Sequence, residues 1–166
     1  MEAKIYERKP DFGKLVSGIA QSRDKFAMEW NARDLKEAIR FGLGSGCKSE
    51  IAAMVPELIA LARASAAPFA FSEIIEALSE VGIDEQKVSA DVVGFLAETA
   101  TMKDAAPYNR EYATRLLRGF ARMPQFEKEV SATLLKVSKD DAERWVRESA
   151  TIRLNEIASL KKAVKA

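Results

Sequence analysis

Apolar residues recur along this chain at intervals of three and four residues, the spacing that places them on one face of an α-helix. Phe12, Leu15, Val16 and Ile19 show the pattern near the start of the chain. Glycines and prolines separate the helical stretches, and no stretch shows the alternation of apolar and polar residues that indicates a strand. The sequence therefore predicts an all-α protein of about four antiparallel helical hairpins, over residues 11–43, 49–82, 85–122 and 125–160.

Short polar residues and one proline predict where individual helices begin and end. Asp11, Asn31 and Ser49 are placed to cap helices, because their side-chain oxygens accept hydrogen bonds from the free amides of a first turn. Pro56 lacks a backbone donor, so we expect it to kink its helix or to lie in a first turn. We expect residues 161–166, KKAVKA, to form a frayed tail.

The last two hairpins share a repeated sequence. Eight positions recur 37 residues apart, and all but the Tyr108–Trp145 pair keep the same residue. Steps of 39 residues then place Phe69 on Tyr108, and Trp30 on Phe69. The eight positions are Asp104, Tyr108, Arg110, Glu111, Ala113, Thr114, Leu117 and Ala121, matched by Asp141, Trp145, Arg147, Glu148, Ala150, Thr151, Leu154 and Ala158.

The apolar positions keep the same register across all four hairpins. A hairpin of this size cannot bury its apolar stripe alone, so we expect the hairpins to stack around a continuous core. This predicts one helical-repeat domain over residues 1–166. The corresponding positions are Leu15, Met54, Val93 and Val130; Ile19, Leu58, Ala97 and Leu134; Leu35, Ile74, Ala113 and Ala150; and Ile39, Leu78, Leu117 and Leu154.

Two-helix units of this length, with an aspartate in the turn before Val-Arg-x-x-Ala-x-x-x-Leu, resemble HEAT repeats. The best match is Asp141 followed by Val146, Arg147, Ala150 and Leu154. This resemblance implies a right-handed α-solenoid with a ladder of charge pairs along the stack. The segment from Trp145 to Ala158 is also similar to the HEAT-like DNA alkylation repair family, whose members hold damaged DNA on a concave surface. No catalytic residue of that family is placed on this sequence.

Charge is spread unevenly although the formal net charge is only +1. Residues 1–44 carry a net charge of +2, residues 45–100 of −6 and residues 101–166 of +5. This indicates an acidic middle and a basic C-terminal part. The single cysteine, Cys47, excludes an internal disulfide, and the absence of histidine excludes histidine-based catalysis and histidine-ligated zinc.

The polar N-terminal residues and the lack of an apolar run of about 18 residues predict a cytoplasmic protein that does not cross a membrane. Gly44 to Ser49 imitates a phosphate-binding loop, but Cys47 separates Gly46 from Lys48 and the preceding stretch is helical by period. We interpret this stretch as a turn between hairpins and expect no cofactor.

The aromatic residues at the repeat period offer two interpretations. Trp30, Phe69, Tyr108 and Trp145 suit a platform on which bases stack. A residue that recurs with the repeat usually supports the repeat, so we favour packing between hairpins and keep Tyr108 and Trp145 as candidate binding residues.

Arginines supply the other candidate binding residues. Arg110 and Arg147 recur with Asp104 and Asp141, which favours structural charge pairs. Arg115, Arg118 and Arg122 form a basic stripe that has no counterpart one unit later, and such a stripe suits phosphate or an acidic partner surface. A solvated face is the alternative interpretation.

Acidic residues of the middle hairpins are the remaining candidates. Their spacing along helix surfaces does not converge, so we assign no metal site and no catalytic residue. They are Glu73, Glu76, Glu80, Asp84 and Glu85.

The sequence thus predicts a non-enzymatic binding module whose second helices line a concave surface for a protein partner. The alternative is a nucleic-acid-binding or DNA-repair protein that uses the basic C-terminal part. An enzymatic activity of another kind and the oligomeric state stay open.

Overall fold

The computed structural model describes residues 9–65 and 67–165, with side chains up to residue 160. Within these ranges every regular element is a helix, which confirms the all-α prediction. The chain divides into two compact units, Met1–Ser89 and Ala90–Ala166. That the four hairpins form one solenoid in a single domain stays a prediction.

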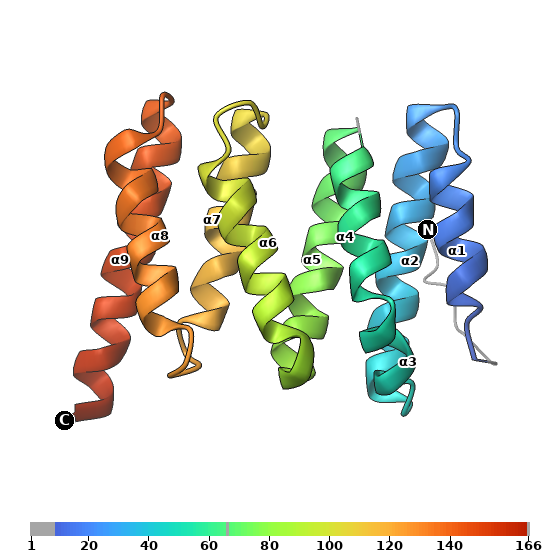
Figure 1. Cartoon of the computed structure of the whole chain (residues 1–166), viewed down its shortest axis with the longest axis horizontal. Helices are drawn as coiled ribbons and strands as arrows, with labels where there is room; N and C mark the ends of the chain where they lie inside the picture. The colour runs from blue at the N-terminus through green and yellow to red at the C-terminus, as the bar shows by residue number, and fades with distance from the viewer. Residues whose placement is uncertain (1–8, 66, 166) are drawn as a thin grey trace. The chain divides into compact units, whose positions relative to one another are not determined.

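The first unit contains two helical hairpins (Figure 1). Helix α1 packs on α2 and on α4, while α2 packs on α5, so that corresponding helices of the two hairpins are neighbours. Their apolar stripes meet in a core that includes Phe12, Leu35, Ile39, Ile74 and Leu78. The elements are α1 (Phe12–Ala20), α2 (Lys25–Gly44), α3 (Lys48–Ala53), α4 (Val55–Ala64), α5 (Pro68–Asp84) and the short 3₁₀ helix η1 (Gln86–Val88).

The second unit also contains two hairpins, α6 (Ser89–Thr101) with α7 (Pro107–Phe120) and α8 (Glu127–Asp140) with α9 (Arg144–Lys165). Helix α9 packs on both α7 and α8. Prolines lie at the first turns of α5 and α7, where the missing amide is not needed by the helix. The buried side chains include Val93, Leu96, Ala113, Leu117, Phe120, Val130, Leu134, Val146 and Ala150.

Most of the predicted core positions are buried. The exceptions are Leu15, Met54, Ala97 and Leu154, which are half-buried. The stripe predicted from helical period therefore identifies the inner face of each helix, and it is least accurate at the edges of that face.

Of the three predicted helix caps, the one at Asp11 is confirmed and those at Asn31 and Ser49 are wrong. The Asp11 carboxylate accepts a hydrogen bond from the Lys14 amide at 3.0 Å, as predicted. Asn31 is not a cap, because α2 begins earlier and Asp24 caps it by accepting from the Ala27 amide at 3.1 Å. The Asn31 amide instead donates to the Gly18 carbonyl, at 3.2 Å, and so ties α2 to α1.

The other boundary predictions have mixed outcomes. Ser49 lies inside the first turn of α3, after Lys48, so its predicted capping role is wrong. Pro56 lies in the first turn of α4, directly after the break at Met54, as expected. The predicted frayed tail is also wrong for residues 161–165, because α9 continues to Lys165 through good helix formers; Ala166 lies outside the described residues.

Candidate functional site

Helices α7 and α9 pack side by side, and polar contacts join their facing sides. The Arg118 and Glu156 side chains form an ion pair with an Nε–Oε2 distance of 2.6 Å. The Ser149 hydroxyl donates to Glu111 Oε1 at 2.8 Å. All the candidate binding residues lie on or directly after these two helices: Tyr108, Arg110, Arg115, Arg118, Arg122, Trp145 and Arg147.

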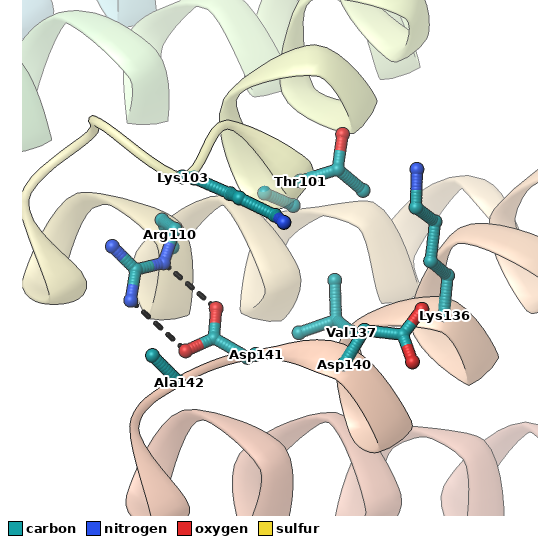
Figure 2. Close-up of a pocket in the computed structure, with 9 residues that line it drawn as sticks. Thr101, Lys103, Arg110, Lys136, Val137, Asp140, Asp141 and Ala142 are labelled. Carbon is teal, nitrogen blue, oxygen red and sulfur yellow. Dashed lines mark hydrogen bonds and ion pairs between the residues drawn. The ribbon is translucent and has the colours of Figure 1, made fainter.

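The Arg110 side chain joins the two hairpins of the second unit (Figure 2). Its Nε donates to Asp141 Oδ2 at 2.7 Å, its Nη2 donates to Asp141 Oδ1 at 2.9 Å, and its Nη1 donates to the Ala105 carbonyl. Both charged side chains are almost completely buried, with 6% and 5% exposure. The predicted charge pair between successive hairpins is therefore present here, and these contacts engage Arg110 within the protein.

The electrostatics of this pair favour its ionised form. Burial opposes ionisation of Asp141, but hydrogen bonds from Arg110 and from the Glu143 amide outweigh it and hold the pKa of Asp141 below its ordinary value. The hydrogen bond to Asp141 raises the pKa of Arg110 further. The pair thus stays charged across the physiological range.

Arg147 is anchored in a similar way, one hairpin later. Its Nη1 donates to the Asp141 carbonyl at 2.5 Å and to the Ala142 carbonyl at 2.9 Å. Ala142 precedes Arg147 by the same five residues by which Ala105 precedes Arg110. The two recurring arginines therefore fix the turns that lead into α7 and α9.

A hollow of about 620 Å³ lies next to the Arg110–Asp141 pair, at the ends of α6 and α8 (Figure 2). Lys103 and Lys136 lie along its wall. Lys103 follows the end of α6 by two residues, and Lys136 lies four residues before the end of α8. Sequence reasoning missed these two residues, since only the packing of the hairpins places them in one hollow.

Exposed Tyr108, half-buried Tyr112 and exposed Arg115 form a column along α7. The Tyr108 and Tyr112 rings are nearly parallel, with centroids 6.0 Å apart, and the Arg115 guanidinium lies 5.4 Å from the Tyr112 ring centroid. Tyr108 is 42% exposed and Trp145, its counterpart on α9, is 44% exposed. The favoured interpretation, in which these rings fill the space between hairpins, is therefore wrong.

The same correction applies to the first unit. Trp30 is 47% exposed and Phe69 is 65% exposed. Phe69, Tyr108 and Trp145 are each the second residue of a helix, whereas Trp30 is the sixth residue of α2. Their recurrence reflects a shared exposed position and not a shared packing role.

On α9 an exposed apolar stripe continues from Trp145. Ile152 follows two turns later and is 51% exposed. It borders a shallow hollow of about 460 Å³, whose lining includes Arg118 from α7 and Leu160 from the end of the described side chains. We use the name α7–α9 surface for the side formed by exposed Tyr108, Arg115, Arg122, Trp145 and Ile152 together with half-buried Tyr112 and Arg118.

Carboxylates balance most of the arginines on and around this surface. Besides the Arg118–Glu156 pair, Arg115 lies 4.0 Å from Glu111 and Arg153 lies 2.9 Å from Glu156. Arg122, just after α7, is exposed. The predicted basic stripe is thus only partly realised, because half-buried Arg118 turns toward α9.

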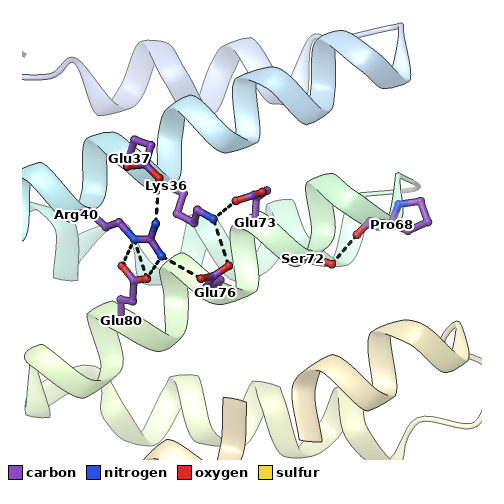
Figure 3. A network of polar contacts seen from close by, with 8 residues as sticks. All are labelled: Lys36, Glu37, Arg40, Pro68, Ser72, Glu73, Glu76 and Glu80. Atoms are coloured by element: carbon purple, nitrogen blue, oxygen red, sulfur yellow. Dashed lines mark hydrogen bonds and ion pairs between the residues drawn. The ribbon is translucent and has the colours of Figure 1, made fainter. Parts of the chain in front are cut away.

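The acidic stripe of the first unit is neutralised by α2 (Figure 3). Lys36 contacts Glu73 and lies 3.2 Å from Glu76. Arg40 lies 2.9 Å from Glu76 and donates from its Nε to both carboxylate oxygens of Glu80 at 2.9 Å. Burial alone would lower the pKa of Lys36, but the two glutamates outweigh it and raise that pKa.

Within the described part of the chain, no cluster of potential ligands is suited to hold a metal ion. The glycine stretch from Gly44 to Ser49 joins α2 to α3, and Gly46 adopts a left-handed φ of 88° in it. Lys48 lies 2.7 Å from the Asp84 carboxylate at the end of α5. Lys48, the residue at the position of a phosphate-binding lysine, therefore forms an ion pair with α5.

No model of a known protein family matches this sequence, and no curated protein matches it either. The two resemblances drawn from the sequence therefore stay predictions. Among the helices that the structure describes, none combines the length and the apolar character needed to cross a membrane.

Proposed function

We propose that this protein is a non-enzymatic helical-repeat binding module and that its α7–α9 surface holds a protein partner. The observation that supports this most is the exposure of Tyr108 and Trp145 beside arginines on two packed helices. Tyrosine, tryptophan and arginine are the residue types that contribute most binding energy in protein interfaces.

The α7–α9 surface combines a fixed scaffold with exposed apolar area. The Arg118–Glu156 and Glu111–Ser149 contacts hold α7 against α9 below the exposed rings. A ring already ordered in the free protein loses little conformational freedom on binding, which favours affinity. A single exposed aromatic residue is ordinary, but Tyr108, Tyr112, Trp145 and Ile152 share two adjacent stripes.

HEAT-like repeats are the architecture that we propose for the hairpins. Within the first unit, corresponding helices of successive hairpins pack on each other. Within the second unit, α7 packs on α9, and Arg110 and Arg147 make equivalent bonds to the preceding turns. Such stacking presents the second helices of successive hairpins on one side, where a partner can contact both.

The charge arrangement favours a protein over a nucleic acid. Phosphate binding requires cations that are free to replace counterions. On and around the α7–α9 surface, Arg115, Arg118 and Arg153 each have a carboxylate within 4.0 Å. Mixed charge around exposed aromatic and aliphatic groups is typical of a surface that recognises another protein.

Site-specific photo-crosslinking in living cells tests the proposal. With benzoylphenylalanine in place of Ile152, we expect a protein adduct that is lost when Tyr108→Ala and Trp145→Ala are added. The matched control places the same cross-linker at Ala132, which is exposed on α8. Adducts that are equal at the two positions, or that persist in the double variant, would contradict the proposal.

A salt titration of binding to labelled duplex DNA tests the nucleic-acid alternative. That alternative predicts a loss of affinity of about a thousandfold or more between 50 and 200 mM salt for a protein that contacts many phosphates. It also predicts that Arg115→Ala/Arg118→Ala/Arg122→Ala abolishes binding, while Arg144→Ala changes it little. We expect no salt-dependent duplex binding.

A further inference from the structure

The hollow at the ends of α6 and α8 contains two cationic side chains without a partner. Lys103 extends from the turn after α6, and Lys136 stands on α8 at the opposite side of the hollow (Figure 2). Among the side chains that the structure describes, neither ammonium group has a hydrogen bond or a carboxylate within ion-pair distance. Lys36 and Lys48, in contrast, are each paired with a carboxylate.

The other charged groups of the hollow do not neutralise the two lysines. Arg110 and Asp141 compensate each other in their buried pair. Asp140 lies four residues after Lys136 on α8, but no described cation lies within ion-pair distance of its carboxylate. The lining therefore has a net charge of +1, and the low-dielectric walls of a hollow focus such a field on a bound anion.

The frame of the hollow is formed before any ligand binds. The Arg110 side chain joins the turn after α6, through the Ala105 carbonyl, to the turn after α8, through Asp141. Ala100 and Val137 belong to the lining and are buried. The volume of about 620 Å³ is within the range of small-molecule sites, roughly 300–1,000 Å³. Binding therefore requires little ordering beyond that of the two lysine side chains.

The type of cation indicates which anion suits the hollow. A carboxylate is matched best by a guanidinium through two parallel hydrogen bonds, and Arg110 already makes such bonds to Asp141. The lysine ammonium groups act as point charges. Two of them suit a phosphate monoester, which has a charge of about −1.5 to −2 and three acceptor oxygens. Unlike the arginines of the α7–α9 surface, these lysines have no carboxylate to displace.

We propose that this hollow binds a small phosphate monoester that carries hydroxyl groups, with the phosphate between Lys103 and Lys136 and a hydroxyl donating to Asp140. The Asp140 carboxylate repels a phosphate but accepts a hydrogen bond from a hydroxyl, so the ligand needs both groups. The site goes beyond the proposed partner binding, because no residue of the α7–α9 surface lines the hollow.

Isothermal titration of the full-length chain with glycerol 3-phosphate tests the two lysines, and glycerol is the probe without a phosphate. We expect glycerol 3-phosphate to bind and glycerol not to bind. Lys103→Ala and Lys136→Ala are each expected to weaken binding about tenfold or more, because each removes a charge-assisted hydrogen bond. The matched control is Lys128→Ala/Lys139→Ala, which removes two exposed lysines of α8 outside the hollow and is expected to change binding little.

Asp140→Ala distinguishes recognition of the whole ligand from a general attraction of anions. The change removes a negative charge, so we expect inorganic phosphate to bind more tightly. It also removes the acceptor for the hydroxyl, so we expect glycerol 3-phosphate to bind more weakly. The ratio of the two affinities is therefore expected to fall about tenfold. An equal change for both probes would overturn the assignment of Asp140.

Three further outcomes would overturn the proposal. They are no binding of glycerol 3-phosphate at millimolar concentration, unchanged binding by the Lys103→Ala and Lys136→Ala variants, and at least about tenfold tighter binding of a short phosphoserine peptide, which would assign the site to a protein ligand. Circular dichroism checks that each variant is folded. Tyr108→Ala/Trp145→Ala is expected to leave binding of glycerol 3-phosphate intact, so this test is independent of the α7–α9 surface.

Discussion

Arg110 and Asp141 form an ion pair with hydrogen bonds of 2.7 and 2.9 Å although 31 residues separate them in the chain. Each side chain is at most 6% exposed. Removal of one member of a buried pair leaves the other charge without compensation, which costs far more than the loss of an exposed pair.

Asp141→Ala is therefore expected to lower the free energy of unfolding by about 3 kcal/mol, the low end of the range for a broken buried pair. Urea denaturation followed by circular dichroism measures the change. The control is Glu148→Ala, which breaks the exposed Arg144–Glu148 pair and is expected to cost less than about 1 kcal/mol. Similar losses of unfolding free energy in both variants would show that the buried Arg110–Asp141 pair stabilises the protein no more than an exposed pair does.

The lowered pKa of Asp141 predicts an acid-dependent stability. A carboxylate whose folded pKa is below its unfolded value contributes stability that is present above the unfolded pKa, about 3.9, and is lost as the pH falls through the folded pKa. We expect the difference in unfolding free energy between the natural chain and Asp141→Ala to shrink below about pH 4. Urea titrations at pH 7, 4 and 3 measure this difference, and a constant difference would contradict the pKa assignment.

Gly42 on α2 lies close to side chains of α1 and α3. A Cβ at this position would lie 2.7 Å from Ile51 Cδ1 and 2.8 Å from the Phe12 ring tip, and both side chains are buried. Gly42→Ala is expected to destabilise the protein by about 1–3 kcal/mol through overpacking. Gly94 is the matched helical glycine, with no atom within 4 Å of the added Cβ, so Gly94→Ala is expected to stabilise by about 0.5–1 kcal/mol. Thermal and urea unfolding of the two variants test whether Gly42→Ala lowers the stability and Gly94→Ala raises it.

The exposure of the aromatic rings makes a further prediction about stability. Trp145→Ala and Tyr108→Ala are each expected to lower the free energy of unfolding by less than about 1.5 kcal/mol, whereas truncation of a fully buried aromatic costs about 3–5 kcal/mol. Phe120→Ala, at 0% exposure, is the buried comparison. A cost for Trp145→Ala equal to that for Phe120→Ala would restore the packing interpretation.

Helical period and repeat spacing predicted the hairpins because they report local properties of the chain. Pro56 and Asp11 lie where predicted, since a missing amide and a capping carboxylate act on the adjacent turn. The predicted cap at Asn31 is wrong because Asp24, earlier in the chain, caps the same helix. The recurring arginines and aspartates predict structural charge pairs, but they do not predict that Arg110 pairs with Asp141.

By itself, the sequence determined that the described chain is helical, where its apolar faces lie and which residues recur from one hairpin to the next. Only the tertiary structure decided which recurring residues are buried: Arg110 is enclosed, while Trp145 and Thr151 remain exposed. The physical reason is that period fixes the direction of a side chain around its own helix, whereas burial depends on whether another element covers that direction. For the same reason Lys103 and Lys136 share one hollow that no pattern in the chain indicates.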